Sequence, residues 1–176
     1  MSGLQRQARL LTIEGGEGAG KTTVLRALRD ALVEDGFEVV TTREPGGTPL
    51  AEAIRELLLH RGDEPVAADT ELLLMFASRA QHVREVVLPA LTRGAWVISD
   101  RFTDSSYAYQ GAARGMDVGF IAELEHRVVG IAPGFTLLLD IDVAHARERT
   151  RGRDLLTGAI PDRIERERDE FFERVR

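Results

Sequence analysis

Apolar runs alternate along the chain with segments of helical periodicity. Four short apolar runs predict buried strands at residues 9–14, 37–42, 95–99 and 135–141. The segments that follow them predict helices over residues 21–34, 50–60, 69–92, 117–130 and 142–151. Strands that are apolar throughout and separated by helices indicate a parallel sheet covered on both faces. The expected fold class is therefore α/β, with three layers and with ligands bound at the carboxyl ends of the strands.

Polar residues mark where these helices should begin. Thr48 is suited to cap the helix that follows it, because Pro49 then occupies the first helical position. The spacing of Asp162 and Glu165 fits a capping box and predicts a last helix. Pro89 should kink or interrupt the long helix of residues 69–92. Aspartates are expected to cap three other helices: Asp69, Asp117 and Asp142.

Composition narrows the class of protein. A chain of 176 residues is long enough for one domain with a substantial core. The net charge of −6 argues against a general nucleic-acid binder, and no apolar run approaches the roughly 20 residues that span a bilayer. The first residues lack the apolar stretch of a secretory signal, and the sequence contains no cysteine, which fits a reducing cytoplasm. We therefore expect a cytoplasmic protein that binds neither nucleic acid nor membrane.

The strongest motif follows the first predicted strand. Residues 15–22 fit the phosphate-binding pattern G-x-x-x-x-G-K-[ST], whose glycines let backbone N–H groups point at phosphate oxygens. Lys21 is the only lysine in the chain, although the sequence contains many arginines. A compact ammonium suits so tight a loop better than a guanidinium does. The alternative is a glycine-rich turn with a surface lysine. The expected ATP-binding residues are Gly15, Gly16, Glu17, Gly18, Ala19, Gly20, Lys21, Thr22 and Thr23.

Charged residues follow the second and third predicted strands. Asp100 comes at the end of the third strand and, with Thr22, is a candidate magnesium ligand. Arginines that converge on a phosphate-binding loop suit a second, acceptor phosphate. The alternative is that they form ordinary surface ion pairs. The candidate arginines are Arg43, Arg55 and Arg101.

Several motifs together resemble the thymidylate kinase family of bacteria. In chain order they are "EGGEGAGKTT", "TREPGGTPLAEAIR", "ASRAQH", "DRFTDSSYAYQG" and "DRIE". The resemblance implies a P-loop kinase that transfers a phosphoryl group from ATP to dTMP with Mg²⁺, and that forms a homodimer. It implies one kinase domain over residues 1–176 with a lid at about residues 148–162. It also implies a longer protein with a fifth strand, because the chain ends within a helical pattern, so we expect a C-terminal part to be missing.

The resemblance also assigns roles to single residues. Arg55 and Arg101 are expected to bind the dTMP phosphate, and Arg79 the thymine edge. Tyr109 is expected against the sugar, and Glu17 and Glu44 near its 3′-hydroxyl and the magnesium region. The remaining expected substrate-binding residues are Phe76, Ser106 and Gln110.

One position departs from the family pattern. The family commonly has a phenylalanine four residues before the base-reading arginine, but this chain has Met75 there, followed by Phe76. Both residues share a helical face with Arg79. Either Met75 or Phe76 is expected to cover the thymine, and the alternative is that both belong to the core.

The P-loop of this chain carries no arginine, so the resemblance implies that the lid supplies a catalytic one. Arg149 and Arg151 are the preferred candidates, followed by Arg153. The alternative is a solvated, charged helix end. The expected catalytic set is Lys21, Arg101, Arg149, Arg151 and Glu17.

Two other classes remain open from the sequence. One is a deoxynucleoside kinase or another nucleoside monophosphate kinase. The other is a P-loop protein that binds a nucleotide without turning it over.

Overall fold

A four-stranded parallel sheet forms the centre of the protein, which we describe from a computed structural model covering residues 3–59, 64–158 and 160–176. The order of the strands is β2-β3-β1-β4, and every neighbouring pair is parallel. The strands are β1 (Gln5–Gly15), β2 (Val39–Arg43), β3 (Trp96–Asp100) and β4 (Ile131–Leu139). The expected α/β class is therefore confirmed, with four strands in the described part of the chain.

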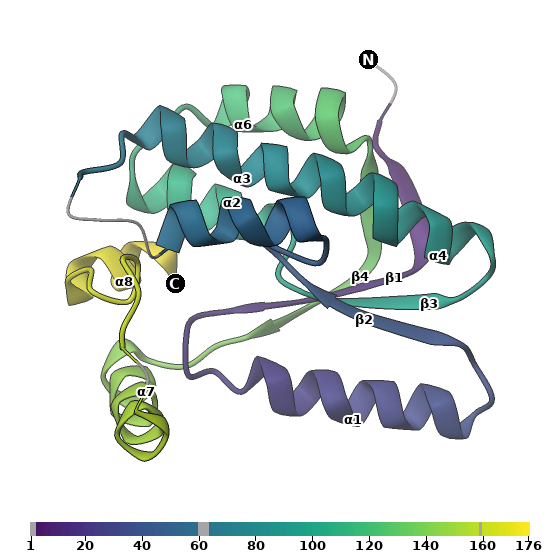
Figure 1. Ribbon diagram of the computed structural model, residues 1–176, viewed down its shortest axis with the longest axis horizontal. Coiled ribbons are helices and arrows are strands. Elements are labelled where there is room, and N and C mark those ends of the chain that lie inside the picture. Colours follow the sequence, from purple (N-terminus) through teal and green to yellow (C-terminus); the bar gives the residue numbers. More distant parts are fainter. Residues whose placement is uncertain (1–2, 60–63, 159) are drawn as a thin grey trace.

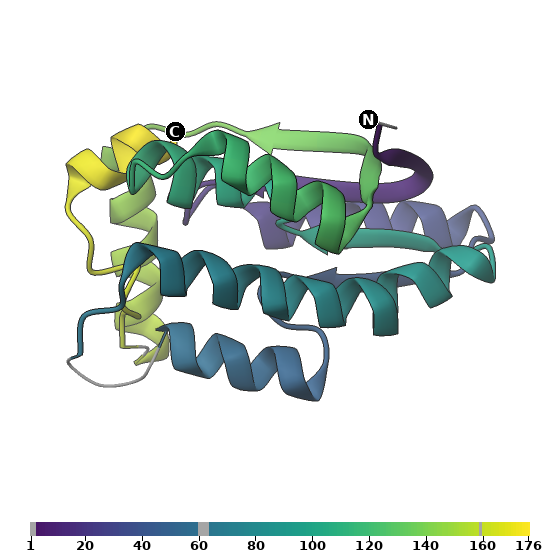
Figure 2. The ribbon, with the colours of Figure 1, turned by 90° about the horizontal axis from the view of Figure 1, so that it is seen from above.

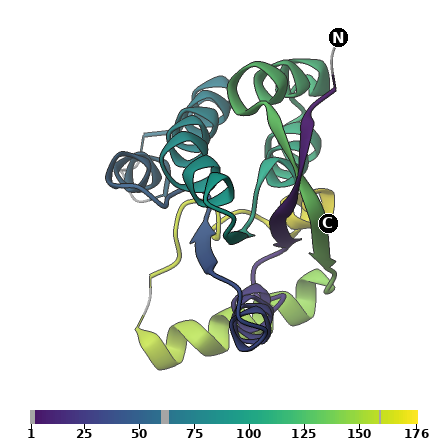
Figure 3. The ribbon, with the colours of Figure 1, turned by 90° about the vertical axis from the view of Figure 1, so that its right-hand side faces the viewer.

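Helices lie on both sides of this sheet (Figures 1 and 3). Helix α1 (Lys21–Glu34) packs on one side, and α2 (Pro49–Leu59), α3 (Ala68–His82) and α6 (Val118–Leu124) lie on the other. Helix α7 (Val143–Thr157) and helix α8 (Asp169–Val175) gather at the end of the sheet where β1 leads into α1. Among the described residues, none of the helices is long and apolar enough to cross a membrane.

The long predicted helix of residues 69–92 is continuous in direction but changes its winding. It consists of α3, the π-helical segment η1 (Val83–Val87) and α4 (Leu88–Thr92) (Figure 2). Pro89 lacks an N–H group, and the widened turn just before it lets the N–H of Leu88 bond to the carbonyl of Val83. The predicted interruption near Pro89 therefore takes the form of a π-helical turn.

Two further π-helical segments widen other helices. The short helix α5 (Thr103–Ser106) continues into η2 (Tyr107–Ala113), and α6 continues into η3 (Glu125–Val129). Gly130 ends η3 with a φ of 74°, in the left-handed region that favours glycine.

The predicted caps are partly correct. Thr48, Asp117 and Asp142 accept hydrogen bonds from the N–H groups of Ala51, Gly119 and His145. Asp69 is not a cap, because α3 already begins at Ala68. His60, the expected end of the second helix, lies outside the described residues.

The expected last helix is placed too early. Asp162 and Glu165 form the reciprocal bonds of a capping box, since Asp162 N–H donates to Glu165 Oε2 and Glu165 N–H donates to Asp162 Oδ1. The chain makes only a turn there, and α8 begins at Asp169. Arg163 explains the difference, because its backbone N–H bonds to the carbonyl of Leu59 and holds the turn against α2.

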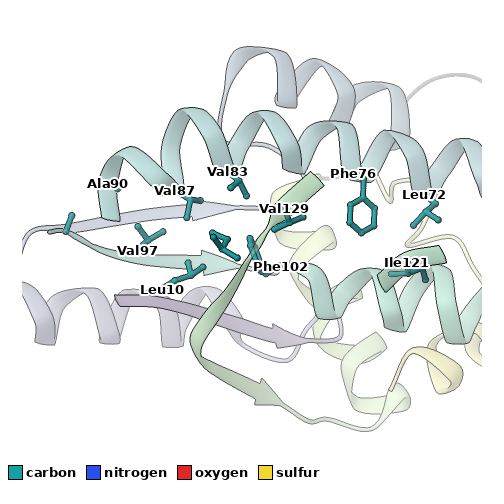
Figure 4. Packing of buried hydrophobic residues seen from close by; sticks show 12 residues of the cluster. Leu10, Leu72, Phe76, Val83, Val87, Ala90, Val97, Phe102, Ile121 and Val129 are labelled. Atoms are coloured by element: carbon teal, nitrogen blue, oxygen red, sulfur yellow. The ribbon is translucent and has the colours of Figure 1, made fainter. Parts of the chain in front are cut away.

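The main core fills the space between the sheet and α3 (Figure 4). Leu10 and Val97 come from the sheet, whereas Leu72, Phe76 and Val83 come from the long helix, and all five are almost fully buried. Phe102 lies among these side chains directly after β3. This core fixes α3, and α3 in turn carries several side chains of the site described below.

Leu72→Ala should lower the free energy of unfolding by about 2–5 kcal/mol, because it leaves a cavity in this core. Leu156→Ala is the matched control, since that leucine is 89% exposed on α7 and should change stability by less than about 0.5 kcal/mol. Urea denaturation followed by circular dichroism measures both values. A loss below about 1 kcal/mol for Leu72→Ala would contradict this description of the core.

Candidate active site

The P-loop turns tightly against two other elements. Gly15 has a φ of 139°, and a Cβ atom there would lie 2.4 Å from the carbonyl oxygen of Leu139 in β4. Gly18 has a φ of 76°, and its Cβ would lie 2.6 Å from the carbonyl oxygen of Ala146 in α7. Only glycine fits both positions, because each combines a left-handed backbone with a close approach. The loop is thereby fixed between the end of β4 and the first half of α7.

Lys21 closes this loop from inside. Its Nζ donates to the carbonyls of Gly15 at 3.0 Å and Gly16 at 2.9 Å, and the residue is only 7% exposed. Burial lowers the pKa of the ammonium, and the nearby charge of Arg101 lowers it further. The alternative of a surface lysine is therefore wrong, since the side chain lies in the loop.

Glu17 and Arg101 join the P-loop to the end of β3. Arg101 Nη2 donates to Glu17 Oε1 at 2.9 Å. Burial acts to raise the pKa of Glu17, yet the positive charges of Arg101 and Lys21 outweigh it and hold this pKa at about 2. Glu17 is consequently ionised over the physiological pH range.

Arg101 has an unusual backbone that aims its side chain at the loop. Its φ is 70°, the left-handed region that few non-glycine residues adopt, and its N–H bonds to the carbonyl of Ile13 at 2.9 Å. The guanidinium lies 5.0 Å from the ring centre of Tyr109 and also donates to the Tyr109 hydroxyl and to Ser105 Oγ. Burial acts to lower the pKa of Arg101, but Tyr109 and Glu17 together raise it.

A cavity of about 440 Å³ opens beside the P-loop, which we call the P-loop cavity. It brings together the arginines expected for an acceptor phosphate, Arg43, Arg55 and Arg101. Two arginines of α7, Arg149 and Arg153, also line it. Its other lining residues are Glu17, Gly18, Gly20, Lys21, Thr22, Glu44, Asp100 and Thr150.

A smaller cavity of about 70 Å³, the acceptor cavity, continues from the first. Glu17, Glu44, Arg55 and Arg101 line both cavities, so the two spaces adjoin. The remaining residues of the acceptor cavity are Pro45, Leu59, Met75, Arg79, Ser105, Ser106, Tyr109, Gln110, Asp162, Ile164 and Glu165.

Met75 and Phe76 have different surroundings. Met75 lines the acceptor cavity, whereas Phe76 is 2% exposed and points into the main core beside Leu72 and Ile121 (Figure 4). Phe76 also lies under the guanidinium of Arg79, 4.8 Å from it. Phe76, which we expected to bind the substrate, therefore lies in the core and supports Arg79 there, and Met75 is the one of the two that lines the acceptor cavity.

Arg79 is held by a buried network. Its Nε donates to Glu44 Oε2 at 2.5 Å, and its two terminal nitrogens donate to Ser106 Oγ and the Phe102 carbonyl, both at 3.0 Å. His82 Nδ1 lies 2.9 Å from the other Glu44 oxygen. Burial acts to raise the pKa of Glu44, but Arg79 and His82 outweigh it and lower this pKa. Both oxygens of Glu44 thus bond within the protein, which makes Glu44 a support for Arg79.

Comparison with known proteins agrees with this geometry. A family model described as thymidylate kinase matches residues 13–176. The chain belongs to the thymidylate kinase family. It is 53% identical to a thymidylate kinase of Teredinibacter turnerae over 169 residues, which are 96% of this chain and 80% of that protein. It is 54% identical to one of Pseudomonas putida over 179 residues, which span 100% of this chain and 80% of the relative. The crystal structure of a thymidylate kinase from Ehrlichia chaffeensis superposes with a TM-score of 0.72 and 36% identity, covering 86% of this chain and 83% of that one.

In this member of the thymidylate kinase family, the segment expected to form a lid is mainly helical. Helix α7 extends to Thr157, six residues beyond the predicted end at Arg151. Arg149 and Arg153 are four residues apart and so share a helix face, which borders the P-loop cavity. Arg151 is exposed and is not among the residues that line the cavity. Ala159, within the expected lid, lies outside the described residues.

The residues expected to hold Mg²⁺ fit that ion. Thr22 and Asp100 both line the P-loop cavity. Asp100 Oδ1 is buried and has no hydrogen-bond partner in the part of the chain that the structure describes. Mg²⁺ prefers oxygen ligands and keeps several waters, so one hydroxyl and one carboxylate beside bound phosphates form a suitable donor set. Within that described part, no group of three or more acidic, histidine or cysteine side chains offers another metal site.

Four residues of the site, three of them buried and Arg163 half-buried, were not assigned from the sequence. Glu14 accepts bonds from the Phe102 N–H at 2.7 Å and from Ser105 Oγ at 2.6 Å, and burial raises its pKa. The sequence feature that could have identified Glu14 is an acidic residue at the end of an apolar strand. The other three are Glu71, His82 and Arg163. His82 and Arg163 occur in recognised motifs, but a motif does not say which partner its polar side chain meets.

The charge of Glu17 should make stability depend on pH. Its pKa of about 2 lies below the ordinary value of 4.5, so its contribution is present above pH 4.5 and is lost as the pH falls towards 2. Glu17→Gln should therefore melt at a lower temperature than wild type at pH 6, and this difference should shrink between pH 4.5 and pH 3. Calorimetry across this range measures it, with Glu34→Gln on the exposed side of α1 as control. A difference that stays constant with pH would contradict the Glu17–Arg101 pair.

Proposed function

We propose that the protein transfers the γ-phosphoryl group of ATP to dTMP, giving dTDP, with Mg²⁺ present. The observation that carries this proposal is the continuity of the two cavities. The P-loop cavity holds a phosphate-binding loop, and the acceptor cavity begins at the arginines that both cavities share. A phosphoryl donor and an acceptor phosphate would therefore meet beside Lys21.

The acceptor phosphate would bind between Arg55 and Arg101. Both arginines line the two cavities, and Arg43 borders the P-loop cavity next to them. Arg55 Nη1 donates to the carbonyl of Pro45 at 3.0 Å, and within the described part of the chain its other N–H groups remain for a ligand. A planar guanidinium group can donate two parallel hydrogen bonds to the oxygens of one phosphate. This arrangement of arginines therefore supports a nucleoside monophosphate as acceptor.

The base would lie against Met75, with Arg79 at its edge. Arg79 has five N–H groups, and three of its bonds go to Glu44, Ser106 and the Phe102 carbonyl. One hydrogen on each terminal nitrogen therefore remains for a carbonyl oxygen of thymine. The rigid support of Arg79 favours a base that presents an acceptor at that point.

Transfer would depend on charge stabilisation by the protein. The migrating phosphoryl group spreads negative charge over its oxygens, and Lys21, the P-loop N–H groups and Arg149 surround the place where it would pass. Mg²⁺, when bound with ATP, supplies further neutralisation of the phosphates. Glu17 holds Arg101 in position beside this path.

A homodimer and a cytoplasmic location belong to the same proposal. The homodimer is what the resemblance described above implies, and the cysteine-free sequence supports the cytoplasmic location. Size-exclusion chromatography with light scattering tests the dimer directly.

A coupled assay with ATP and a panel of nucleoside monophosphates tests the proposed reaction. The value of kcat/KM for dTMP should exceed that for dCMP by at least about tenfold, because a buried polar group left unpaired costs about 1–3 kcal/mol. Lys21→Arg should reduce turnover strongly although it keeps the charge. Equal turnover of dCMP and dTMP would contradict the proposed recognition of thymine. Binding of nucleotide without turnover would show that the protein is a non-catalytic P-loop protein.

The face of α7 that borders the P-loop cavity leads to a separate prediction. Arg149→Ala should lower kcat by at least about tenfold, with a smaller change in KM for dTMP, because the contact forms mainly in the transition state. Arg151→Ala is the matched control two residues away and should leave kcat within about threefold of wild type. A larger loss for Arg151→Ala than for Arg149→Ala would show that the lid turns another face to the nucleotide.

A further inference from the structure

Glu71 is a buried carboxylate on α3 that the proposed reaction does not use directly. It is 1% exposed, and its Oε1 accepts a hydrogen bond from Gln110 Nε2 at 2.8 Å. Its Oε2 accepts one from Arg163 Nη2 at 2.6 Å, and Arg114 approaches the same oxygen at 3.3 Å. Glu71 thus lies behind a cavity-lining side chain, on the side away from the ligand.

The carboxylate is ionised in these surroundings. Burial acts to raise the pKa of Glu71, but the hydrogen bonds from Gln110 and Arg163 outweigh burial and lower this pKa. An ionised carboxylate can only accept hydrogen bonds. The amide nitrogen of Gln110 must therefore face Glu71, and the amide cannot turn over without placing oxygen against oxygen.

This constraint decides which atom Gln110 offers to a ligand. Gln110 is 1% exposed and lines the acceptor cavity together with Arg79 and Met75. Among the described residues, no side chain or backbone group donates a hydrogen bond to the side-chain oxygen of Gln110, Oε1. The atom left for a base is thus an acceptor. Thymine and uracil carry an N–H donor at N3, whereas cytosine carries a lone pair there.

We propose that Glu71 is a positioning residue for base selection: by holding the amide nitrogen of Gln110, it makes the acceptor cavity accept bases with an N3–H group and disfavour cytosine. This inference rests on the proposed function, since it assumes that the acceptor cavity binds the base. Recognition of thymine then depends on two supporting carboxylates, Glu44 in the loop after β2 and Glu71 on α3. Glu44 presents the donors of Arg79, and Glu71 presents the acceptor of Gln110.

The decisive variant is Glu71→Gln, which keeps the shape of the side chain but can both donate and accept. It frees Gln110 to turn its amide. The ratio of kcat/KM for dTMP to that for dCMP should fall at least about tenfold, mainly through KM for dTMP. The ratio for dTMP to dUMP should stay within about threefold, because both bases have N3–H. If the substitution loosens the acceptor cavity in general, both ratios will change together, and that result would overturn the proposal.

Two control experiments test whether Glu71 acts through the side-chain amide of Gln110. Arg114→Gln weakens the surroundings of Glu71 but leaves its bond to Gln110, so it should keep both ratios within about threefold of wild type. In a Gln110→Met background, Glu71→Gln should change the dTMP to dCMP ratio no further, because the group through which it acts is gone. An equal effect of Glu71→Gln in both backgrounds would contradict a role through Gln110.

Binding and folding controls separate this inference from the proposed function. Calorimetric dissociation constants for dTMP, dUMP and dCMP without ATP should show the same pattern of ratios. If wild type binds dTMP selectively but does not phosphorylate it, the proposed reaction fails and the role of Glu71 stands. If Glu71→Gln does not fold, Glu71→Asp serves instead, because it keeps an acceptor-only group and should hold the dTMP to dCMP ratio within about threefold. A collapse of that ratio in Glu71→Asp would overturn the proposal.

Discussion

The buried pair of Glu44 and Arg79 is the interaction on which the site depends. It joins the loop after β2 to the last turn of α3, and His82 and Ser106 complete the bonds of both partners. Neither side chain is more than about 3% exposed, so removal of either would leave an unpaired buried charge, a change that typically costs about 3–5 kcal/mol. The Glu44–Arg79 pair therefore holds α3 in place, both against the core and beside the acceptor cavity.

Much of the fold could be predicted because its signals are local. Apolar runs placed all four strands, and the spacing of residues 15–22 identified the P-loop. The π-helical turns could not be predicted, since only Pro89 hinted at one of them and the exact winding depends on packing. The last helix was placed too early because the capping box formed as expected while Arg163 tied the turn to α2.

Many of the residues that line the two cavities were expected from the sequence, but the directions of their side chains were not. Met75 and Phe76 share a helical face with Arg79, so spacing alone could not decide which one meets the cavity. Packing decided it, since Phe76 fills the core. Arg149 and Arg151 both lie within the helix predicted over residues 142–151, and the sequence did not show which face of that helix meets the phosphates. The structure separates them, because Arg149 lines the P-loop cavity and Arg151, two positions further along the helix, points to a different side.

The close approach of Gly18 to Ala146 also limits how this site can evolve. Any side chain at position 18 would meet the carbonyl of Ala146, so an arginine could enter the loop there only if α7 moved away. The phosphates can thus receive a cation from position 18 of the loop or from α7, but not from both. Replacing the cation of α7 by an arginine at position 18 would therefore require changes in both the loop and α7. A substitution at position 18 alone would disturb the loop and would not place a new charge beside the phosphates.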